Sequence, residues 1–342
     1  MKPSSMGAPK IYLGAKIGKL ELRNGVKAFY FSMLQYVQEA IKNAEKHMAQ
    51  KNINKRASTL IITNYSPELD GSDELDEIEA TYYQSLIGIL RWLVEMGRMD
   101  ISMEVSALSS HVALSRIGHL NQVYHIFAYI KINHNARIVL DPSYPDVDER
   151  DYKKQDWTNF YGKETEPIPS NAPEPLGKEF IMRAYVDASF ANCKLTRRSR
   201  TGFVIFLNCA PIYWFSKKQG FTEISTFGSE FVAMRQCCEY VRGLRYKLRM
   251  MGINVSNPTL IYGDNQSVLW NTKVPKSALK KKLAAVAYHF CREGVARNEW
   301  VTNYCKTSEN PGDVMTKTVV QERKKKIRML LYDIYPEESD IH

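Results

Sequence analysis

Hydrophobic residues recur along the first half of the chain with two different periods. Residues 11–32 alternate apolar and polar positions around Asn24 and Gly25, a pair that supplies the positive φ angles of a tight hairpin turn. Four later segments carry apolar residues at steps of three and four: 33–51, 80–97, 101–114 and 118–133. This spacing predicts amphipathic helices whose apolar stripes pack into a core. The first half is therefore predicted to be mostly helical, with a hairpin before the helices and a short strand, ARIVLDP, after them.

The periodicity disappears between residues 142 and 175, where six prolines stand among many charged residues. Proline-rich, charged stretches without an apolar period are typical of linkers. We therefore predict three regions in the chain: a first domain over 1–141, a linker over 142–179 and a second domain over 180–335.

After residue 180 the pattern changes to short apolar runs. Three of them follow one another with only short breaks and predict an antiparallel meander: FIMRAYVD, TGFVIFLN and PIYWFSKK. Helical patterns and apolar runs then alternate as a helix over 227–251, the strand TLIYGD, helices over 266–272 and 278–297, the strand WVTNYCK and a final helix over 312–332. This order predicts a mixed sheet covered by helices, an α/β or α+β layer fold.

The length and composition of the chain indicate which classes of protein it can belong to. The chain has 342 residues, 44% of them apolar, which is enough for two cores. It contains no run of about 20 apolar residues, so we expect no membrane span, and its N-terminus lacks the apolar region of a signal peptide. All six cysteines lie in the second half without a C-x-x-C pair, which favours reduced thiols over zinc ligands or disulfides. We expect an intracellular location, in a cytoplasmic particle or the nucleus, rather than secretion.

Charge is divided unevenly along the chain. Residues 1–180 hold 21 Lys and Arg against 23 Asp and Glu, a net charge of −2, whereas residues 181–342 hold 26 against 14, a net charge of +12. The whole excess of +10 therefore comes from the second half. A solubilising surface would explain a basic half by itself. An acidic pocket on a basic surface suits a polyanionic substrate, and the second half also holds the acidic residues described next.

Four carboxylates in this basic half stand where strands should end or helices begin. Asp187 ends the run RAYVD, Glu230 opens a helical pattern in STFGSEFVAM, Asp264 closes TLIYGD, and Asp313 precedes the basic C-terminal segment. In α/β folds, side chains at such positions gather in one cleft. Clustered carboxylate oxygens are ligands that Mg²⁺ prefers, and two such ions about 4 Å apart can cleave a phosphodiester bond. For each residue taken alone, a role as a helix cap or turn residue is the alternative.

Seven motifs of the second half stand in the order and spacing of one known family: YVDASFA, TRRSRTG, YWFSKKQ, STFGSEFVA, YGDNQS, LKKKLAAVAYHFCREGVA and NPGDVMTK. Through these motifs the second half resembles the ribonuclease H domain of copia-type LTR retrotransposon polyproteins. Three motifs of the first half are similar to the reverse transcriptase of the same polyproteins, from the end of its palm through its thumb and connection: IYLGAKIG, YYQSLIGILRWLVEMGRMDI and HIFAYIK.

The resemblance implies a fold, an activity and a metal site. The fold would be a ribonuclease H-like mixed five-stranded sheet with flanking helices, preceded by a mostly helical reverse transcriptase remnant. The activity would be metal-dependent cleavage of the RNA strand of an RNA–DNA hybrid, recognised by its shape and its 2′-hydroxyls. Asp187 would bridge two Mg²⁺ or Mn²⁺ ions. Glu230 and Asp264 would hold the ion near the leaving oxygen, and Asp313 would help to hold the ion that activates water.

Basic residues near these motifs are candidates for contacts with nucleic-acid phosphates. They form two groups: Arg197, Arg198 and Arg200 with Lys217 and Lys218, and the consecutive Lys280, Lys281 and Lys282. For the first group a solvated turn is equally compatible with the sequence. Three consecutive lysines repel one another unless a polyanion or solvent screens them, which favours the second group as a binding patch. Trp214 and Trp270 are expected in the core rather than as platforms on which bases stack.

Three departures from the family's pattern restrict these expectations. The aromatic-x-Asp-Asp signature of the polymerase is absent, so the chain is expected to be a truncated fragment without polymerase activity. Residues 282–285 read Lys-Leu-Ala-Ala where many members have Lys-His-x-Asp, which removes that histidine. Gly312 stands before Asp313 where alanine is common, and we expect it to loosen this last ligand.

Two alternatives remain open. The second half is compatible with a folded remnant that binds nucleic acid without cutting it. The whole chain is compatible with a relic that folds poorly without its missing palm. The expected partners are an RNA–DNA hybrid and the remainder of a retroelement polyprotein, and no membrane is expected.

Overall fold

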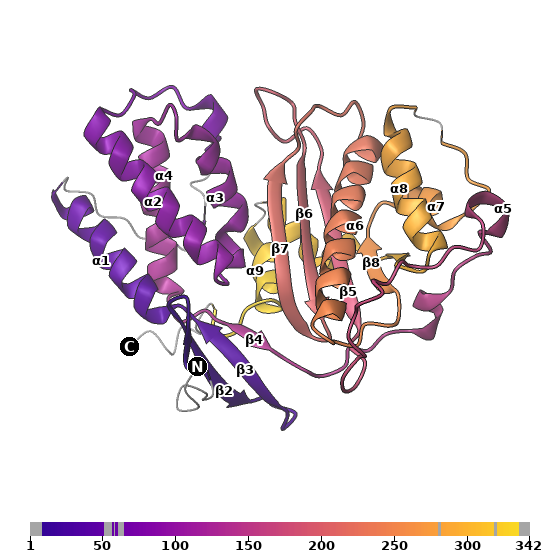
Figure 1. Cartoon of the computed structure of the whole chain (residues 1–342). Coiled ribbons are helices and arrows are strands. Elements are labelled where there is room, and N and C mark those ends of the chain that lie inside the picture. Colours follow the sequence, from indigo (N-terminus) through magenta and orange to yellow (C-terminus); the bar gives the residue numbers. More distant parts are fainter. Residues whose placement is uncertain are drawn as a thin grey trace. The chain divides into compact units, whose positions relative to one another are not determined.

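The computed structural model describes residues 9–50, 57, 59–60, 65–279, 282–317 and 320–334 (Figure 1). The contacts between residues divide the chain into two units. Unit 1 contains the described residues up to Asp141 together with those from residue 320 onward, and unit 2 contains Pro142–Lys317. The end of the chain thus belongs to the first unit, whereas the sequence predicted a second domain that continues to residue 335.

A small antiparallel sheet begins unit 1. Its strands pair in the order β1 (Ile11–Tyr12), β2 (Ala15–Glu21), β3 (Lys27–Ser32) and β4 (Ile138–Leu140). In the turn between β2 and β3, Gly25 has a φ of +79°, a conformation that glycine adopts without steric cost. The hairpin and the short closing strand predicted from the sequence are therefore confirmed.

Four helices form the core of unit 1: α1 (Leu34–Gln50), α2 (Glu77–Glu95), α3 (Ser102–Leu108) and α4 (Ile117–Ile132). Their apolar stripes are buried in one cluster, as with Leu86 and Leu90 of α2. α2 begins where the Asp76 carboxylate accepts a hydrogen bond from the backbone N–H of Glu79 at 2.8 Å, which caps the helix. The helix predicted over 101–114 is shorter than expected, because a 3₁₀ turn follows α3.

Helix α9 (Val320–Arg328) completes unit 1 although it follows unit 2 in the sequence. The Arg323 guanidinium pairs with the buried carboxylate of Glu104 in α3 and donates to the carbonyl oxygen of Asp100 at 3.0 Å. The single final helix predicted over 312–332 is wrong. The structure has two separate elements there, the 3₁₀ helix η8 (Pro311–Met315) in unit 2 and α9 in unit 1.

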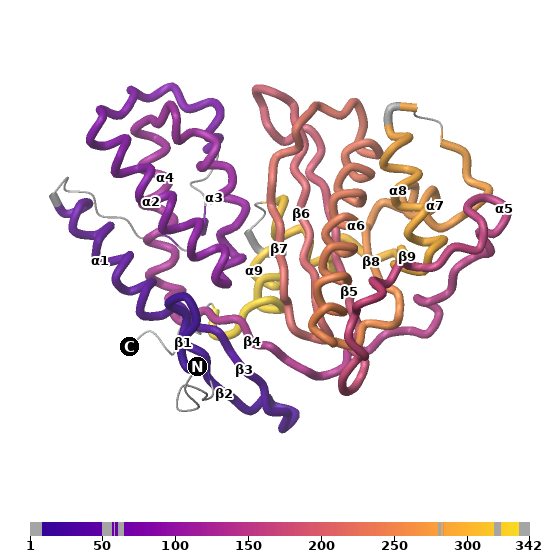
Figure 2. Tube along the Cα trace, in the orientation of Figure 1, coloured from indigo at the N-terminus to yellow at the C-terminus, as the bar shows by residue number. Residues whose placement is uncertain are grey.

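Unit 2 is built on a five-stranded mixed sheet with the strand order β7-β6-β5-β8-β9. Its first three strands form an antiparallel meander: β5 (Met182–Ser189), β6 (Arg200–Leu207) and β7 (Ala210–Lys218). β8 (Thr259–Gly263) pairs in parallel with β5, and β9 (Trp300–Tyr304) pairs in parallel with β8. The chain trace of this sheet can be followed in Figure 2. The predicted meander and the mixed sheet are both confirmed.

Three longer helices flank the sheet: α6 (Thr226–Met250), α7 (Gln266–Lys273) and α8 (Ala285–Ala296). α6 lies across one face of the sheet (Figure 1) and buries Phe231 in a core shared with the strands. η8 packs against β6 at Gly202, where an added Cβ would lie 2.5 Å from side-chain atoms of Met315 and Thr316. Glycine therefore permits this close approach of η8 to the sheet.

The proline-rich segment 142–179 packs against the rest of unit 2 and contains the short helices η5 (Glu149–Tyr152) and α5 (Thr158–Tyr161). Glu166 forms ion pairs with Arg245 and Arg249 of α6, with N–O distances of 2.7 and 2.6 Å. Trp157 is 3% exposed, and the Arg292 guanidinium of α8 lies 4.7 Å from the centre of its ring. The segment predicted to be a linker is thus held in place by buried charged and aromatic contacts.

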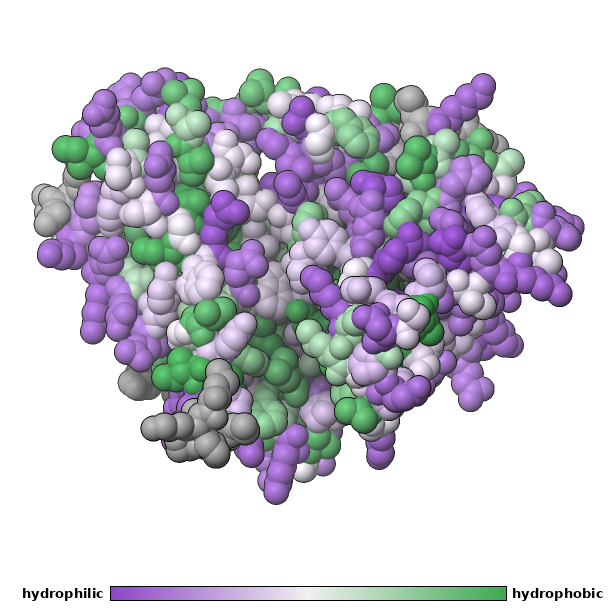
Figure 3. Space-filling model, in the orientation of Figure 1, coloured by the Kyte–Doolittle hydropathy of each residue, from purple (hydrophilic) through white to green (hydrophobic). Residues whose placement is uncertain are grey.

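Hydrophilic side chains cover much of the face drawn in Figure 3, with hydrophobic residues scattered between them. Among the helices that the structure describes, none combines the length and the apolar character needed to cross a membrane.

Candidate metal centre

Asp187 lies near the end of β5, directly across from Gly202 of β6. Its side chain is 1% exposed. Its Oδ1 accepts a hydrogen bond from Lys317 Nζ at 3.1 Å, and its Oδ2 accepts one from the Thr316 hydroxyl. A buried carboxylate is costly unless donors or cations surround it. Asp187 therefore depends on the two residues that follow η8.

Asp264 directly follows β8, the parallel neighbour of β5. Since the carboxyl ends of parallel strands meet at one edge of a sheet, this position brings Asp264 to Asp187. The Thr307 hydroxyl donates to Asp264 Oδ2 at 2.7 Å. The next residue, Asn265, accepts hydrogen bonds from two backbone N–H groups of α7 and begins that helix. The chain thus turns away at once and leaves the Asp264 carboxylate at the end of the strand.

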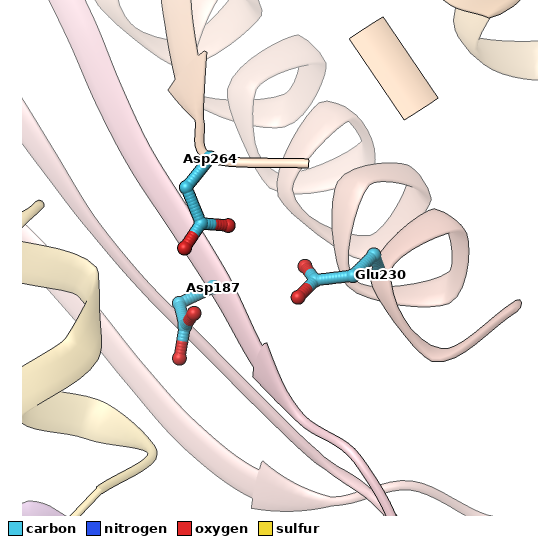
Figure 4. A group of neighbouring side chains, drawn as sticks. All are labelled: Asp187, Glu230 and Asp264. Carbon is cyan, nitrogen blue, oxygen red and sulfur yellow. The ribbon is translucent and has the colours of Figure 1, made fainter. Parts of the chain in front are cut away.

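Glu230 reaches the same place from α6, near the start of the helix. Figure 4 shows its carboxylate directed toward those of Asp187 and Asp264. The ligand oxygens of these three side chains all lie within 4.8 Å of one another. Carboxylate oxygens at this separation fit the coordination of one hard divalent cation such as Mg²⁺.

Asp313, the fourth predicted carboxylate, lies in η8 beside this group and is 5% exposed. Lys317 connects it to the other three, because the Lys317 Nζ atom lies 2.6 Å from Asp313 Oδ1 and 3.1 Å from Asp187 Oδ1. The four carboxylates singled out from the sequence therefore lie in one region of unit 2. Three of them form a group, and the fourth is joined to it through an ammonium.

Crowding of negative charge perturbs the acids of this group. Burial, together with the negative charges of Asp187 and Asp264, raises the pKa of Glu230 to about 9. Burial also raises the pKa of Asp187 to about 6, although the Lys317 ammonium opposes the increase. Burial alone would lower the pKa of Lys317, but the carboxylates of Asp187 and Asp313 outweigh it and raise that pKa above its usual value. The site is thus short of positive charge.

The segment 310–317 holds the site together, and the sequence prediction missed this role. The Asn310 side chain donates to the carbonyl oxygen of Val186 at 2.9 Å and accepts from the backbone N–H of Gly312 at 2.9 Å. A Cβ on Gly312 would lie 2.9 Å from the carbonyl oxygen of Tyr185. Contrary to the expected loosening, glycine at this position permits tight packing of η8 on β5. The Asn-Pro-Gly sequence, typical of a turn, was the signal that could have revealed it.

The basic residues predicted to contact phosphates differ in exposure. Arg197 and Lys217 are exposed and Arg198 and Lys218 are half-buried, whereas Arg200 is 5% exposed and donates to the Ser216 hydroxyl at 3.2 Å. Arg200 and Lys218 face each other across β6 and β7, so the structure brings these two together.

Two of the three lysines in the second basic group are not among the residues that the structure describes. Lys280 and Lys281 lie outside the described residues, and Lys282 is exposed at the start of a 3₁₀ turn.

Trp270 is 62% exposed on α7, so its expected burial is wrong. The short helix turns Val268 and Thr272 toward the core and leaves Trp270 on its outer side.

The strand order and the flanking helices define an α/β protein with a mixed five-stranded sheet, as the sequence predicted. The chain is homologous to retrovirus-related Pol polyproteins of plant transposons. It is 25% identical over 252 residues to the Pol polyprotein of transposon RE1 from Arabidopsis thaliana, an alignment that covers 74% of this chain and 15% of the relative. It is 29% identical over 147 residues to that of transposon TNT 1-94 from Nicotiana tabacum, covering 43% and 11%. The chain thus spans less than a fifth of the length of these relatives. No family model matches it.

The solved structures that match part of this chain include ribonuclease H1 from the halophilic archaeon Halobacterium salinarum. That likeness has a TM-score of 0.32 and 12% identity, and it covers 40% of this chain and 93% of the other. A foamy viral protease-reverse transcriptase in complex with double-stranded DNA matches with a TM-score of 0.40 and 12% identity, covering 86% of this chain and 37% of the other.

Proposed function

We propose that this chain contains the ribonuclease H region of a copia-type retrotransposon polyprotein, and that unit 2 hydrolyses the RNA strand of RNA–DNA hybrids. The observation that carries this proposal is the convergence of Asp187, Glu230 and Asp264 from two parallel strand ends and a helix start. Homology to Pol polyproteins agrees with it. Hydrolysis of a phosphodiester needs concentrated positive charge at the scissile phosphate, which these carboxylates can supply only by holding cations.

The residues present fit Mg²⁺ or Mn²⁺. All the ligand atoms are carboxylate oxygens, which hard divalent cations prefer. Burial is the main reason that the pKa values of Asp187 and Glu230 are raised, and neighbouring carboxylates add to it. Asp187, Glu230 and Asp264 would hold one ion, and Asp187 with Asp313 would hold a second. Bound ions in such a centre activate a water molecule and stabilise the leaving oxygen.

Other residues of the chain orient these ligands. The hydroxyls of Thr316 and Thr307 donate to the carboxylates of Asp187 and Asp264, and each fixes one oxygen so that the other is directed elsewhere. The exposed Arg197, Lys217 and Lys282 are the candidates for contacts with the hybrid's phosphates. Such contacts position a duplex without reading its sequence, which suits an enzyme that recognises hybrid shape.

We assign unit 1 to the end of the palm, the thumb and the connection of the reverse transcriptase. The 342 residues contain no pair of consecutive aspartates, so this chain by itself is not expected to polymerise nucleotides. Unit 1 would then help to hold nucleic acid and would not contribute a second catalytic centre.

The test is cleavage of a labelled RNA–DNA hybrid by the purified full chain with Mg²⁺ or Mn²⁺. Asp264→Asn keeps the shape of the side chain but removes its charge, and we expect the cleavage rate to fall at least about a hundredfold. Asp148→Asn is the matched control, because Asp148 pairs with Arg150 at an exposed position and should leave the rate unchanged. Salt-sensitive binding of the hybrid without cleavage in either metal would instead identify a binding remnant that has lost catalysis.

A further inference from the structure

Lys317 occupies an unusual position for a surface-type side chain. Its ammonium lies between two of the four carboxylates, 2.6 Å from Asp313 Oδ1 and 3.1 Å from Asp187 Oδ1. The side chains of Asp187 and Asp313 are 1% and 7% exposed, whereas that of Lys317 is 36% exposed, so the carboxylates are buried and the lysine reaches them from the surface. The resemblance to known polyproteins assigned no role to this residue.

We infer that Lys317 acts as an internal cation that competes with a second divalent ion for Asp187 and Asp313. The inference rests on the proposed metal centre. A first ion binds the group formed by Asp187, Glu230 and Asp264 while Lys317 stays in place. A second ion binds only when the ammonium leaves the two carboxylates. Lys317 thus sets how many ions the centre holds at a given metal concentration.

Electrostatics supports a competition rather than joint occupancy. A divalent ion that used Asp313 Oδ1 and Asp187 Oδ1 would lie within a few ångströms of the Lys317 ammonium, where like charges repel strongly in a poorly solvated site. Four carboxylates and one ammonium carry a formal charge of −3. One divalent ion reduces this to −1, whereas a second would reverse it to +1.

Hydrogen bonding leads to the same conclusion. Both oxygens of Asp187 already accept from side chains, Oδ1 from Lys317 and Oδ2 from Thr316. The Thr316 hydroxyl is neutral, so its rotation would not change the charge of the site. Withdrawal of the Lys317 ammonium would remove a positive charge from two carboxylates at once. The lysine contact is therefore the one whose loss creates a place for another cation.

The experiment is a calorimetric titration of Mn²⁺ into the full chain, so that the readout is ion binding rather than catalysis. We expect the wild-type protein to bind one ion tightly. We expect the affinity of Lys317→Gln for a second ion to be at least tenfold higher than that of the wild-type protein. Lys317→Arg keeps the positive charge and should behave like wild type. Lys178→Gln makes the same charge change at an exposed position and should leave the isotherm unchanged.

The double variant Lys317→Gln with Asp313→Asn locates the effect, because it should lose the additional ion. An unchanged isotherm for Lys317→Gln, or two equally tight ions in wild type, would overturn the inference, as would the absence of any bound ion in both proteins. If the wild-type protein cleaves the hybrid but Lys317→Gln has the same isotherm as the wild type, this inference alone is refuted. Two ions in Lys317→Gln without any cleavage refute the proposed function alone.

Discussion

Glu230 lies beside two other carboxylates, and we expect its ionised form to lower the stability of the protein without metal. Its pKa is raised from an ordinary value of 4.5 to about 9 by burial and by Asp187 and Asp264. The native state then binds a proton that the unfolded chain has already lost, so stability without metal should fall as the pH rises from about 4.5 to 9. Glu230→Gln removes this penalty. We expect it to raise the free energy of unfolding by about 1 kcal/mol at pH 8, with little change at pH 4, as measured by urea unfolding with a chelator.

Addition of Mn²⁺ should reverse this order, because only the wild-type protein keeps the ligand that links ion binding to folding. Glu239→Gln is a suitable control on the same helix, since Glu239 pairs with Arg235 at a partly exposed position. Equal destabilisation of Glu230→Gln at both pH values would show that the side chain has a packing role instead.

The proximity of the four carboxylates could be predicted from the sequence because each adjoins a strand end or a helix start. Lys317 and Asn310 could not, since their roles depend on the backbone path that carries η8 across β5 and β6. Gly312 illustrates the difficulty. A missing side chain suggests looseness in a sequence, yet here its absence allows close packing, because a Cβ at this position would lie only 2.9 Å from the carbonyl oxygen of Tyr185.

At the scale of elements, the segment 142–179 departs most from its expected role. Its prolines and charges lack any apolar period, and that pattern predicted a linker. The structure holds it by specific pairs, such as Glu166 with Arg245, which are separated by 79 residues in the sequence. Periodicity indicates which faces are apolar and carries no information about distant charge pairs. The meander and the helices α1, α2, α4 and α6, whose signals are local, were predicted correctly, whereas the final helix over 312–332 was not.

Glu166→Ala should be strongly destabilising, because Arg245 is 0% exposed and would keep a buried charge without its carboxylate. We expect the free energy of unfolding of unit 2 to fall by about 3 kcal/mol in urea unfolding at pH 7. Although burial raises the pKa of Glu166, Arg245 and Arg249 outweigh it and lower that pKa below 4.5. The contribution of Glu166 should therefore be complete at pH 7 and disappear as the pH falls below about 4.5.

Glu164→Ala provides the matched comparison in the same segment. Glu164 is 56% exposed and pairs with Arg297, which keeps Glu293 as a second partner, so we expect a loss of less than about 1 kcal/mol. Similar losses for both variants would argue that the segment 142–179 contributes through its backbone rather than through the buried ion pairs.

At the scale of the whole molecule, the chain leaves unit 1 at residue 141 and returns to it after residue 317. The sequence favoured two contiguous domains, because residues 312–332 contain no proline and no glycine after Gly312 and suggested one helix. In the structure η8 belongs to unit 2 and α9 belongs to unit 1, where Arg323 pairs with Glu104. The periodicity of the sequence cannot reveal such a contact. Any fragment that ends near residue 317 would therefore remove an element of unit 1.

Arg323→Ala tests this path of the chain directly. Glu104 is 0% exposed and pairs with Arg323, so the variant leaves a buried carboxylate without its cation, a loss of about 3 kcal/mol. We expect hydrogen exchange to accelerate in α2, α3 and α4 while the strands of unit 2 exchange as before, measured on the full chain by mass spectrometry.

Replacement of both partners, Arg323→Met with Glu104→Met, should recover most of this loss, because two apolar side chains leave no charge uncompensated. Asp333→Asn weakens the half-exposed pair with Arg137 and should have a much smaller effect. Faster exchange in the strands of unit 2 than in α2, α3 and α4 would contradict the assignment of α9 to unit 1. If exchange instead accelerates in unit 1 alone, unit 2 keeps its stability when the contacts of Arg323 are lost, and the carboxylates of the proposed metal centre can be studied separately from the end of the chain.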